Sequence, residues 1–356
     1  MRAIGRASTL AAMATAQPSR RGPAAARADR SFERLAGPYR REIKLHCYRM
    51  LGSLHEAEDA VQETYLRAWR AFDSLEDGGA IGAWLYRIAT NASLDALASR
   101  KQARRLLPDQ HGPAAAALQL PETPATEIAW LEPYPEAGLE TVADEAPNPE
   151  ARYSSREAVQ LAFVAAIQEL PPRQRASVLL CDVLGWASGE AATLLGGSAA
   201  SVNSALQRAR DTLAKRYPDG RRPVSPRPTA EQRKLLDRYL KAWEGHDIKG
   251  FVALLKEDAA VVMPPWLQWF VGRETIGSFF AAAWQSCGGL RLIPTAANAQ
   301  PAFAVYERSN TDGLWHAHSI HVLTLDRGAI ATLTAFVPPT GPDLFPAFGL
   351  PRVHDA

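Results

Sequence analysis

The sequence predicts a multidomain chain with two all-α domains followed by an α+β domain. Three observations lead to this fold class. Residues 31–105 and residues 156–217 carry apolar side chains at three- and four-residue spacing, which is typical of amphipathic helices. From residue 229 onward, helical patterns are followed by segments of strand character. The expected helices are Ala230–Gly245, Ile248–Leu255 and Arg273–Gln285, and the expected strands are Ala259–Met263, Ala302–Glu307, His316–Leu325 and Ile330–Val337. Proline-rich stretches without a period separate these parts, at residues 106–155 and 218–228, and are expected to be linkers.

Length and composition allow several hydrophobic cores and exclude some classes of protein. The chain has 356 residues, of which 47% are hydrophobic, and a formal net charge of +2. No apolar run approaches the ~20 residues that cross a bilayer, so no membrane association is expected. The three cysteines, Cys47, Cys181 and Cys287, form no CxxC pair. Neither a disulfide framework nor a zinc site is therefore expected, which fits a reducing cytoplasm.

The two ends of the chain are predicted to be tails. Residues 1–30 are rich in Ala, Arg and Pro and are expected to be disordered. A signal or transit peptide in this stretch is disfavoured because its apolar part is short and poorly hydrophobic. Residues 341–356 are assigned to a C-terminal tail.

The first helical domain is predicted to contain three helices and one loop. One apolar stripe runs through Leu45–Leu51, and a second runs from Ala57 to Trp69. Residues Phe72–Gly82 contain aspartates and glycines and are expected to form the loop. A third helix follows and ends in a basic cluster that comprises Arg100, Lys101, Arg104 and Arg105.

The linker at residues 106–155 is acidic, with nine Asp/Glu against two Arg between Pro121 and Glu157. Its polar composition predicts that the two helical domains move relative to each other. Trp130, Leu131 and Tyr134, in the run WLEPYPE, are candidates for docking against another part of the chain.

The most specific local signal is Ser188–Leu213, where a short helix, a glycine turn and a longer helix predict a helix-turn-helix. Ser198 is the expected N-cap of the longer helix. Its apolar side chains share one face, and side chains that hydrogen-bond base edges and phosphates share the other. These outward residues are Ser201, Asn203, Ser204, Gln207, Arg208 and Arg210. A helical hairpin with a solvated polar face is the alternative. Nine Lys/Arg against three acids from Ala199 to Lys234 favour a polyanion.

Three segments together resemble the extracytoplasmic-function (ECF) sigma factors. They are HEAEDAVQETYLRAWRAF (His55–Phe72), AWLYRIATNASLDALASR (Ala83–Arg100), and ELPPRQRASVLLCDVLGW with the helix-turn-helix (Glu169–Leu213). Their order and spacing match sigma domain 2, a linker and sigma domain 4. The resemblance covers roughly residues 31–216 and implies binding to the β and β′ subunits of core RNA polymerase and to promoter DNA.

The resemblance also implies roles for individual residues. Contact with polymerase, or support of the contacting helix, would come from Asp59, Gln62, Glu63, Arg67 and Trp69. Recognition and opening of the −10 element would come from Phe72, Asp73, Trp84, Arg87, Asn91, Arg100 and Lys101. Melted DNA needs stacking surfaces and cations, which this stretch supplies. A core role for Trp69, Trp84 and Tyr86 stays open. The six outward residues of the helix-turn-helix would read the −35 element, with Asn203 standing where many members carry Lys.

Residues 229–340 resemble the SnoaL-like domains of the NTF2 superfamily. The resemblance rests on RYLKAWEGHDIKGFVALLKEDAAVVMPP, WFVGRETIGSFF and the strand HAHSIHVLTL, and it implies a conical α+β barrel with a pocket. Candidate pocket residues are Trp266, Trp269, Phe270, Trp284, Tyr306, His316 and His318. Core or interface positions are an equal alternative for the tryptophans and Phe270.

The histidines of this domain raise the question of metal binding or catalysis. Strand alternation places His316, His318 and Ile320 on one face and His321 on the other. No third ligand accompanies the pair, so no metal is expected. Acid–base catalysis would draw on a carboxylate and an acid donor in an apolar cavity, from Asp247, Asp258, Tyr306 and the three histidines. Satisfied or exposed histidines are the favoured interpretation.

The sequence therefore predicts a cytoplasmic transcription initiation factor without catalytic activity or cofactor. Its C-terminal domain would regulate it by shifting the arrangement of the two helical domains, with a small ligand as a candidate effector. One alternative is an enzyme of the SnoaL or isomerase type whose helical half regulates it. Another is a DNA-binding repressor or activator that works without polymerase.

Overall fold

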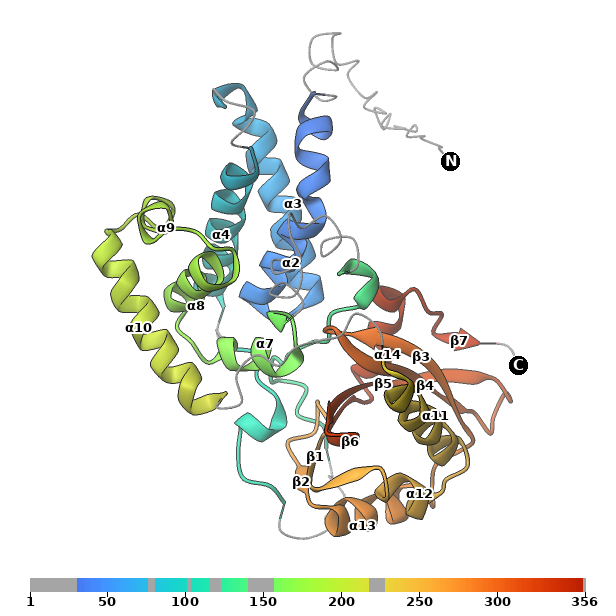
Figure 1. The fold of residues 1–356 in the computed structure, drawn as a ribbon. Helices are drawn as coiled ribbons and strands as arrows, with labels where there is room; N and C mark the ends of the chain where they lie inside the picture. The colour runs from blue at the N-terminus through green and yellow to red at the C-terminus, as the bar shows by residue number, and fades with distance from the viewer. Residues whose placement is uncertain are drawn as a thin grey trace, which may run out of the picture.

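The structure is a computed structural model that describes residues 31–75, 81–100, 104–115, 123–139, 157–217 and 228–354. Two groups of helices and a curved sheet lie against one another (Figure 1). Helical domains followed by an α+β domain are the fold class that the sequence predicts. The tail at residues 1–30, Lys101 and most of the linker at 218–228 lie outside the described residues. Among the described helices, none has the length and apolar character needed to span a membrane.

The first helical domain is a bundle of three long helices. They are α2 (Arg40–Leu51), α3 (Leu54–Arg70) and α4 (Ile81–Ser99), preceded by a helical segment at residues 31–36 and a 3-10 turn, η1 (Gly37–Tyr39). Gly52 ends α2 with a φ of 70°, which favours glycine, and Ser53 caps α3 by accepting a hydrogen bond from the Glu56 amide.

The predicted loop at Phe72–Gly82 is shorter than expected. It begins with a 3-10 turn, η2 (Phe72–Ser74), but α4 already starts at Ile81, so Gly82 is helical. A Cβ at Gly82 would lie 2.8 Å from Cε1 of Tyr39. Gly82 is therefore a packing glycine that lets the Tyr39 ring approach α4 closely.

The second helical domain follows the predicted order of helices. Its elements are α7 (Leu161–Gln168), α8 (Pro172–Val178), a π-helical turn η6 (Leu179–Val183), α9 (Ser188–Leu195) and α10 (Ala199–Arg216). Pro172 occupies the first turn of α8, where its missing N–H costs nothing. Gly196 is left-handed with a φ of 64°, and the Ser198 hydroxyl caps α10 by accepting from the Ser201 amide. The helix-turn-helix predicted from Ser188–Leu213 is present.

The C-terminal domain is a curved sheet with three helices against its concave face, α11 (Ala230–Glu244), α12 (Ile248–Val252) and α13 (Arg273–Ala283). A short helix, α14 (Gly341–Leu344), packs on the opposite face. Its strands are β1 (Leu255–Val262), β2 (Trp269–Val271), β3 (Leu290–Ala297), β4 (Gln300–Arg308), β5 (Trp315–Asp326), β6 (Ala329–Phe336) and β7 (Val353–His354). The strand order is β2-β1-β6-β5-β4-β3, with β7 paired to β5. Only the β1–β6 pair of this described sheet is parallel.

Three details of this domain correct the sequence-based expectations. The helix expected at Ile248–Leu255 ends at Val252, because Leu255 already pairs with Ile330 as part of β1. β2, β3 and β7 were not expected. Residues 341–354, assigned to a tail, fold onto the sheet, where Phe345 is fully buried against the Tyr306 ring.

A β-bulge corrects the predicted faces of β5. Val305 pairs with Ser319 whereas Tyr306 pairs with Ala317, so His318 is the extra residue. Beyond the bulge, His321 pairs with Phe303 and faces the concave side, while Ile320 faces the opposite side. Glu307 alternates along β4 to the same concave side as Val305. His316 pairs with Glu307, and His318 Nε2 lies 3.9 Å from Glu307 Oε2, so neither histidine shares a face with Ile320.

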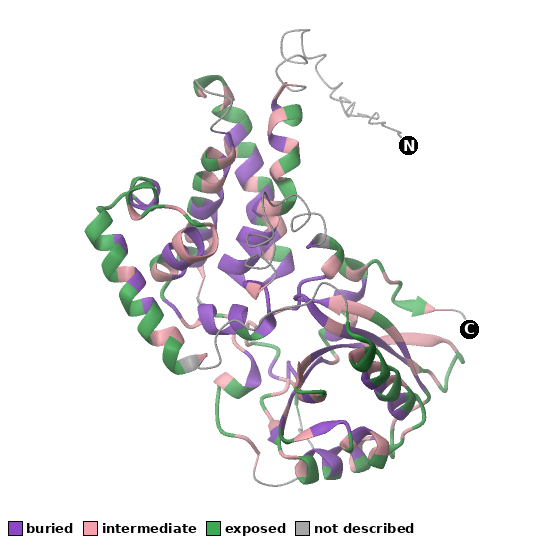
Figure 2. Ribbon diagram, in the orientation of Figure 1, coloured by how far each residue is buried: buried purple, intermediate pink, exposed green. Residues whose placement is uncertain are grey.

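Burial is concentrated in two clusters (Figure 2). One fills the cone between α11–α13 and the concave face of the sheet. The other is continuous through both helical domains and reaches the opposite face of the sheet, including Ala304, Ile320 and Phe345. The helical half and the C-terminal domain therefore share one core in this arrangement.

The acidic linker packs against both halves in its described part. We call residues 123–139 the strap. Its Glu132 amide donates to Gly52 O, its Ala125 amide donates to Pro265 O, and Pro135 bridges to Ala297. Trp130, Leu131 and Tyr134 are all buried, at 7%, 0% and 2% exposure. The aromatic run that the sequence proposes for docking is therefore docked, and the expected freedom of this linker does not extend to the strap.

Candidate nucleic-acid interface

The outward face of α10 has the geometry that the sequence predicts. All six predicted residues are exposed, whereas Val202, Leu206 and Ala209 are buried beneath them. Asn203 accepts a hydrogen bond from the Ser188 hydroxyl at 2.6 Å, which ties α10 to α9. Ser201 and Ser198 hydrogen-bond each other at the helix start. The face is thus a held, solvent-facing array of amide, hydroxyl and guanidinium groups.

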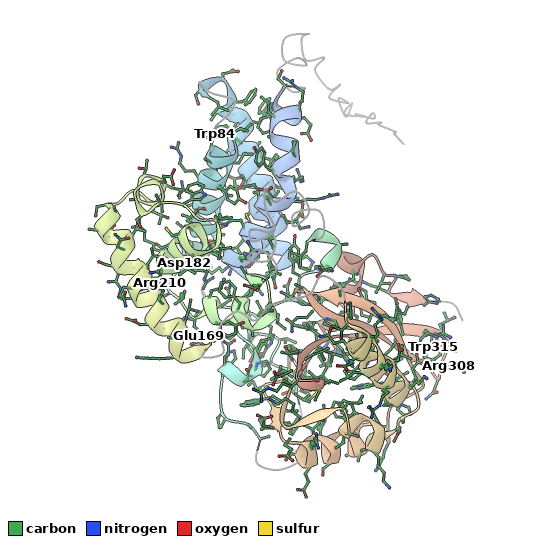
Figure 3. All side chains as sticks on the ribbon, in the orientation of Figure 1. Trp84, Glu169, Asp182, Arg210, Arg308 and Trp315 are labelled. Atoms are coloured by element: carbon green, nitrogen blue, oxygen red, sulfur yellow. The ribbon has the colours of Figure 1, made fainter. Side chains whose placement is uncertain are left out.

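The two arginines of this face have different surroundings. Arg210 forms a bidentate pair with Asp182 of the π-helical turn, at 2.6 and 3.1 Å (Figure 3). This pairing raises the pKa of Arg210. Among the described residues, Arg208 has no ion-pair partner within 4 Å. Arg208 is therefore the guanidinium most available to a ligand, while Arg210 also anchors its helix.

An exposed stripe runs along α3. Asp59, Gln62, Leu66 and Trp69 are all exposed at spacings of three and four residues, so they share one face. Leu66 is 42% and Trp69 39% exposed. Leu66 was missed by the sequence analysis, although its spacing from Gln62 and Trp69 is the signal that identifies it. Two large apolar side chains are thus exposed to solvent on one helix face, a feature that is frequent at protein–protein contacts.

Other predicted residues of α3 hold the helix. Arg67 donates to Glu63 at 2.6 Å and to Asp95 of α4 at 2.8 Å. These bonds raise the pKa of Arg67, first through Asp95 and then through Glu63. Arg67 therefore couples α3 to α4.

The residues predicted for the −10 element fall into three environments. Arg87 and Asn91 are exposed on α4, and Asp73 is exposed in η2. Phe72 is half-buried, with its ring 5.3 Å from that of Phe32. Trp84 lines a cleft of about 700 Å³ between α4 and α9, which Trp186 and Glu190 close from the other side. In this arrangement the α4 surface faces the helix-turn-helix domain.

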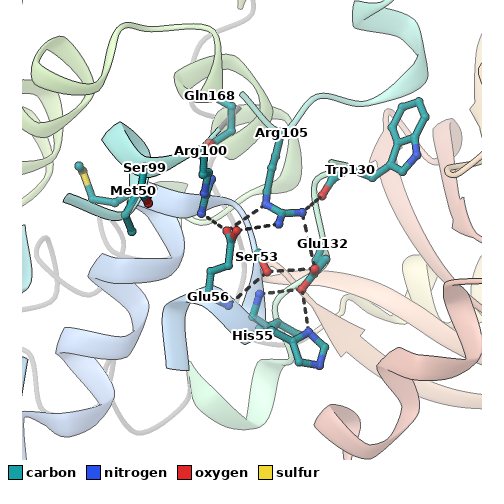
Figure 4. A network of polar contacts seen from close by, with 12 residues as sticks. Met50, Ser53, His55, Glu56, Ser99, Arg100, Arg105, Trp130, Glu132 and Gln168 are labelled. Carbon is teal, nitrogen blue, oxygen red and sulfur yellow. Dashed lines mark hydrogen bonds and ion pairs between the residues drawn. The ribbon is translucent and has the colours of Figure 1, made fainter. Parts of the chain in front are cut away.

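Arg100 is held within the protein. Its guanidinium pairs with Glu56 of α3, which also pairs with Arg105 at 3.0 Å (Figure 4). Burial first, and then the like charge of Arg105, lower the pKa of Arg100 to about 10. The prediction that Arg100 supports strand opening thus requires this network to rearrange.

Arg175 joins the two helical domains. It is fully buried and donates to the carbonyls of Ile167, Gln168 and Leu170 at the end of α7. It also donates to Met50 O, at the carboxyl end of α2. Burial lowers its pKa to about 9. A cation at two helix C-termini is electrostatically favourable, and here it fastens one domain to the other.

Asn298 joins three parts of the chain at one point. It sits in the β3–β4 turn with a φ of 55° and is fully buried. Its Nδ2 donates to Tyr48 Oη at 3.0 Å and to Val159 O at 2.8 Å, and its Oδ1 accepts from the Tyr134 amide at 2.8 Å. The turn of the C-terminal domain therefore contacts α2, the strap and the segment before α7. Figure 1 shows this hairpin reaching the base of both helical domains.

The predicted pocket residues do not form one cavity wall. Phe270 and Tyr306 are fully buried and Trp284 is 8% exposed, which makes them core residues. Tyr306 belongs to the opposite face of the sheet from Phe270 and Trp284. Trp269 donates through Nε1 to Gly112 O, which fixes the first part of the linker to the edge strand β2.

The interior of the cone is packed with aromatic rings. Trp243 lies within 5.1–5.5 Å of Phe251, Phe280 and Trp284, measured between ring centroids. His321 is 2% exposed, and it hydrogen-bonds Tyr239 Oη at 2.9 Å and Ser319 Oγ at 3.0 Å. Burial, then the neighbouring His318, lower the pKa of His321 to about 3. His321 is thus a satisfied, neutral core histidine, and no metal-binding group of three or more ligands occurs among the described residues.

Three protein-family models match separate parts of the chain. Residues 35–105 match the model of Sigma-70 region 2, residues 160–213 match Sigma-70, region 4, and residues 236–333 match the SnoaL-like domain. The combination defines a sigma factor with an additional C-terminal domain.

Relatives narrow the class further. The chain is 43% identical over 319 residues to the ECF RNA polymerase sigma factor SigG of Mycobacterium tuberculosis (strain CDC 1551 / Oshkosh), covering 88% of this chain and 82% of that protein. It is 32% identical over 184 residues to SigE of Mycolicibacterium smegmatis, covering 51% of this chain and 60% of SigE. The chain belongs to the ECF RNA polymerase sigma factors. As such it binds core RNA polymerase and promoter DNA, and the relatives do not support the alternative of an enzyme.

A solved structure shares the fold. The crystal structure of the Mycobacterium tuberculosis ECF sigma factor SigJ aligns with a TM-score of 0.58 at 21% sequence identity, over 91% of this chain and 100% of that chain. The alignment extends through the helical half and the C-terminal domain.

Proposed function

We propose that this chain directs core RNA polymerase to promoters from an open arrangement of its helical domains, and that the C-terminal domain regulates it by stabilising the closed arrangement. The exposed stripe of α3 contacts the β and β′ subunits in the cytoplasm. The loop after α3 and the surface of α4 engage the −10 element, and the outward face of α10 reads the −35 element. The observation that carries the proposal is the Asn298 junction, which ties all three domains together.

The geometry of a promoter explains why the closed arrangement would be inactive. The −10 and −35 elements are named for their positions. They are about 25 base pairs apart, and at about 3.4 Å per base pair they lie ~85 Å apart along the duplex. Here α8 packs directly on α4, and the rings of Tyr86 and Trp186 lie 6.2 Å apart. Domains in contact cannot reach both elements. Promoter binding therefore requires them to separate.

A small regulatory ligand, on this proposal, binds between the halves. The interior of the cone holds aromatic side chains, but a groove of about 940 Å³ lies between α7, the linker and the sheet. Gln160 and Glu169 line it from the helical side, and Thr332 and Thr334 line it from β6. A ligand there would change how tightly the two halves pack, and such differential affinity is what shifts a population.

Replacing Leu66 with lysine is expected to weaken association with core polymerase by more than about tenfold, because a charge would enter an apolar contact. The thermal midpoint should stay unchanged, since the side chain is already 42% exposed. Affinity pull-down and runoff transcription with purified core enzyme measure the association, and thermal unfolding followed by circular dichroism measures the midpoint. Leu267→Lys is the matched control: Leu267 is 48% exposed on the C-terminal domain, and its change should leave core binding intact. No association of the unaltered chain with core polymerase would refute the proposed function.

Replacing Arg208 with alanine is expected to weaken binding to a −35 duplex by ~1–3 kcal/mol, or about 5- to 150-fold, with loss of sequence preference. The guanidinium is exposed and points away from the domain core, so folding should not change. Electrophoretic mobility shifts of the holoenzyme with cognate and scrambled −35 sequences measure the effect. Lys215→Ala removes the same charge two turns further along α10 and should weaken both duplexes equally. Equal behaviour of the two variants would contradict the assignment of Arg208.

A further inference from the structure

The carboxylate of Glu132 occupies an anion-binding site at the start of α3. We call this site the seat, and it comprises Ser53, the Leu54 amide, His55 and Arg105. Glu132 Oε2 accepts a hydrogen bond from the Leu54 amide, the first N–H of α3, at 2.7 Å. Its Oε1 accepts from the hydroxyl of Ser53, the N-cap, at 3.0 Å. Arg105 Nη1 lies 3.8 Å from Oε1, and His55 Nδ1 lies 3.7 Å from Oε2 (Figure 4). A helix N-terminus with its N–H groups and dipole favours an anion, and cationic groups add to it.

The strap holds Glu132 in this seat through its backbone. The Glu132 amide donates to Gly52 O at 3.0 Å, and its carbonyl accepts from Tyr48 Oη at 2.8 Å. Gly52 is required here, because a Cβ would lie 3.1 Å from Leu131 Cδ1 in addition to the strain of a positive φ. The contact is thus made by the docked strap and is lost when the strap departs.

A second observation shows spare binding capacity beside the seat. Arg100 Nη1 is buried and has no acceptor among the described residues. With the strap docked, the local cluster of Arg100, Arg105, Glu56 and Glu132 carries two positive and two negative charges. Without Glu132 it carries one net positive charge, an empty helix N-terminus and an unsatisfied guanidinium N–H. Arg100 and Arg105 then share the single carboxylate of Glu56, so the vacated seat presents an excess positive charge and free N–H groups that attract another anion.

We propose that a backbone phosphate of promoter DNA binds in this seat when the strap leaves. Glu132 then acts as a competing anion that occupies the seat while the strap is docked. The proposal rests on the proposed function. Two oxygens of a phosphate accept from an N–H and an O–H as the two carboxylate oxygens do. Arg100 directly follows α4, whose exposed Arg87 and Asn91 are assigned to the −10 element, so the seat lies at the carboxyl end of that helix. Phosphate contacts of this kind fix the register of a protein on DNA.

The experiment compares binding of the full-length chain to a fluorescently labelled non-template −10 oligonucleotide as salt is raised. Glu132→Gln keeps the size of the side chain and removes its charge. We expect it to bind the oligonucleotide about tenfold more tightly, because a competing anion is weakened. The slope of log K against log salt should steepen by about 0.7, the value for one added phosphate contact on a single strand. Adding Arg105→Ala should cancel both changes.

Glu136→Gln is the matched control for loosening of the strap. Glu136 is the other strap carboxylate with a described backbone contact, accepting from the Ala299 amide on the C-terminal domain at 3.1 Å. Its neutralisation removes the same charge but leaves Glu132 in the seat, so the salt slope should not change. An equal gain in oligonucleotide affinity in both variants would show that strap release alone is responsible. That result would overturn the proposed phosphate site.

A change in the DNA provides a test that does not depend on the fold of any variant. Single methylphosphonate substitutions neutralise one phosphate at a time along the oligonucleotide. One position should weaken binding of Glu132→Gln and leave the unaltered chain unaffected. An unchanged slope, or no such position, overturns the proposal. If Glu132→Gln gained affinity for core polymerase but not for the oligonucleotide, the proposal would also be overturned, because the seat would then bind a carboxylate of that enzyme. Failure here with intact core binding and promoter-specific transcripts leaves the proposed function standing.

Discussion

Replacing Asn298 with alanine is expected to open the two helical domains and to raise promoter-dependent transcription. The change deletes three buried side-chain hydrogen bonds, to Tyr48, Tyr134 and Val159. It also places alanine at a φ of 55°, which asparagine tolerates better. Leaving buried partners unsatisfied costs about 1–3 kcal/mol each, so ~3 kcal/mol is a low estimate for the closed arrangement. That free energy shifts the ratio of closed to open molecules by about 150-fold.

Small-angle X-ray scattering and fluorescence transfer between labels on α4 and α10 measure this opening. The radius of gyration should rise and the transfer efficiency fall, while runoff transcription increases. Asn298→Gly separates the two causes, because glycine accepts the positive φ and still lacks the amide. Arg327→Ala is the control: Arg327 has a φ of 49° in the exposed β5–β6 turn, away from the helical domains. Unchanged dimensions and transcription in Asn298→Ala would show that the junction does not hold the closed state.

Mild acid is expected to destabilise the fold through two buried histidines. His46 is 1% exposed and hydrogen-bonds Thr90 Oγ1 at 2.9 Å; burial, then the Arg49 charge, lower its pKa from 6.5 to about 3. His321 has a pKa of about 3 for the reasons given above. Between pH 6.5 and 3 the unfolded chain binds a proton at each histidine and the folded chain does not. The contribution of the two neutral histidines to the free energy of unfolding is therefore fully present above the unfolded pKa of about 6.5, and it decreases as the pH falls below that value.

The dependence of the free energy of unfolding on pH follows from the number of protons that the unfolded chain binds in excess of the folded chain. Each histidine contributes about 1.4 kcal/mol per pH unit, so lowering the pH from 6.5 to 5.0 costs about 2 kcal/mol in the domain that contains it. His46 acts in the first helical domain and His321 in the C-terminal domain, for a total of ~4 kcal/mol where they unfold together. Urea unfolding at several pH values measures this. His46→Gln and His321→Gln should each flatten the slope by one proton, whatever their stability at pH 8. A slope that persists in both variants would rule out these histidines as the cause.

Both predictions concern contacts that cross the domain boundaries or the core, and the sequence alone did not point to them. Asn298 and Tyr48 are 250 positions apart. Nothing in the local pattern around NAQP indicates that its turn enters the helical half. His321 was placed on the opposite face from His316 because alternation assumes an unbroken strand, and the bulge at His318 breaks it.

The local elements, by contrast, followed from the residues. The spacing of Val202, Leu206 and Ala209 set the buried face of α10, and Ser198 and Gly196 set its start. The six outward residues were found exposed as predicted, because the period of a helix assigns faces without reference to any other part of the chain. The residues Asp59, Gln62 and Trp69 of the exposed stripe on α3 were named by the family resemblance, whereas Leu66 was recognised only from its exposure in the structure.

The sequence by itself determined the helices, the helix-turn-helix, the family and the α+β character of the third domain, since these depend on short-range periodicity, capping and motif order. Tertiary structure alone decided that the acidic linker docks as a strap, that Arg100 is neutralised by Glu56 and that Glu132 fills an anion seat on α3. Those outcomes depend on which side chains meet across many tens of residues. Such meetings are set by the packing of whole domains, which no local pattern records.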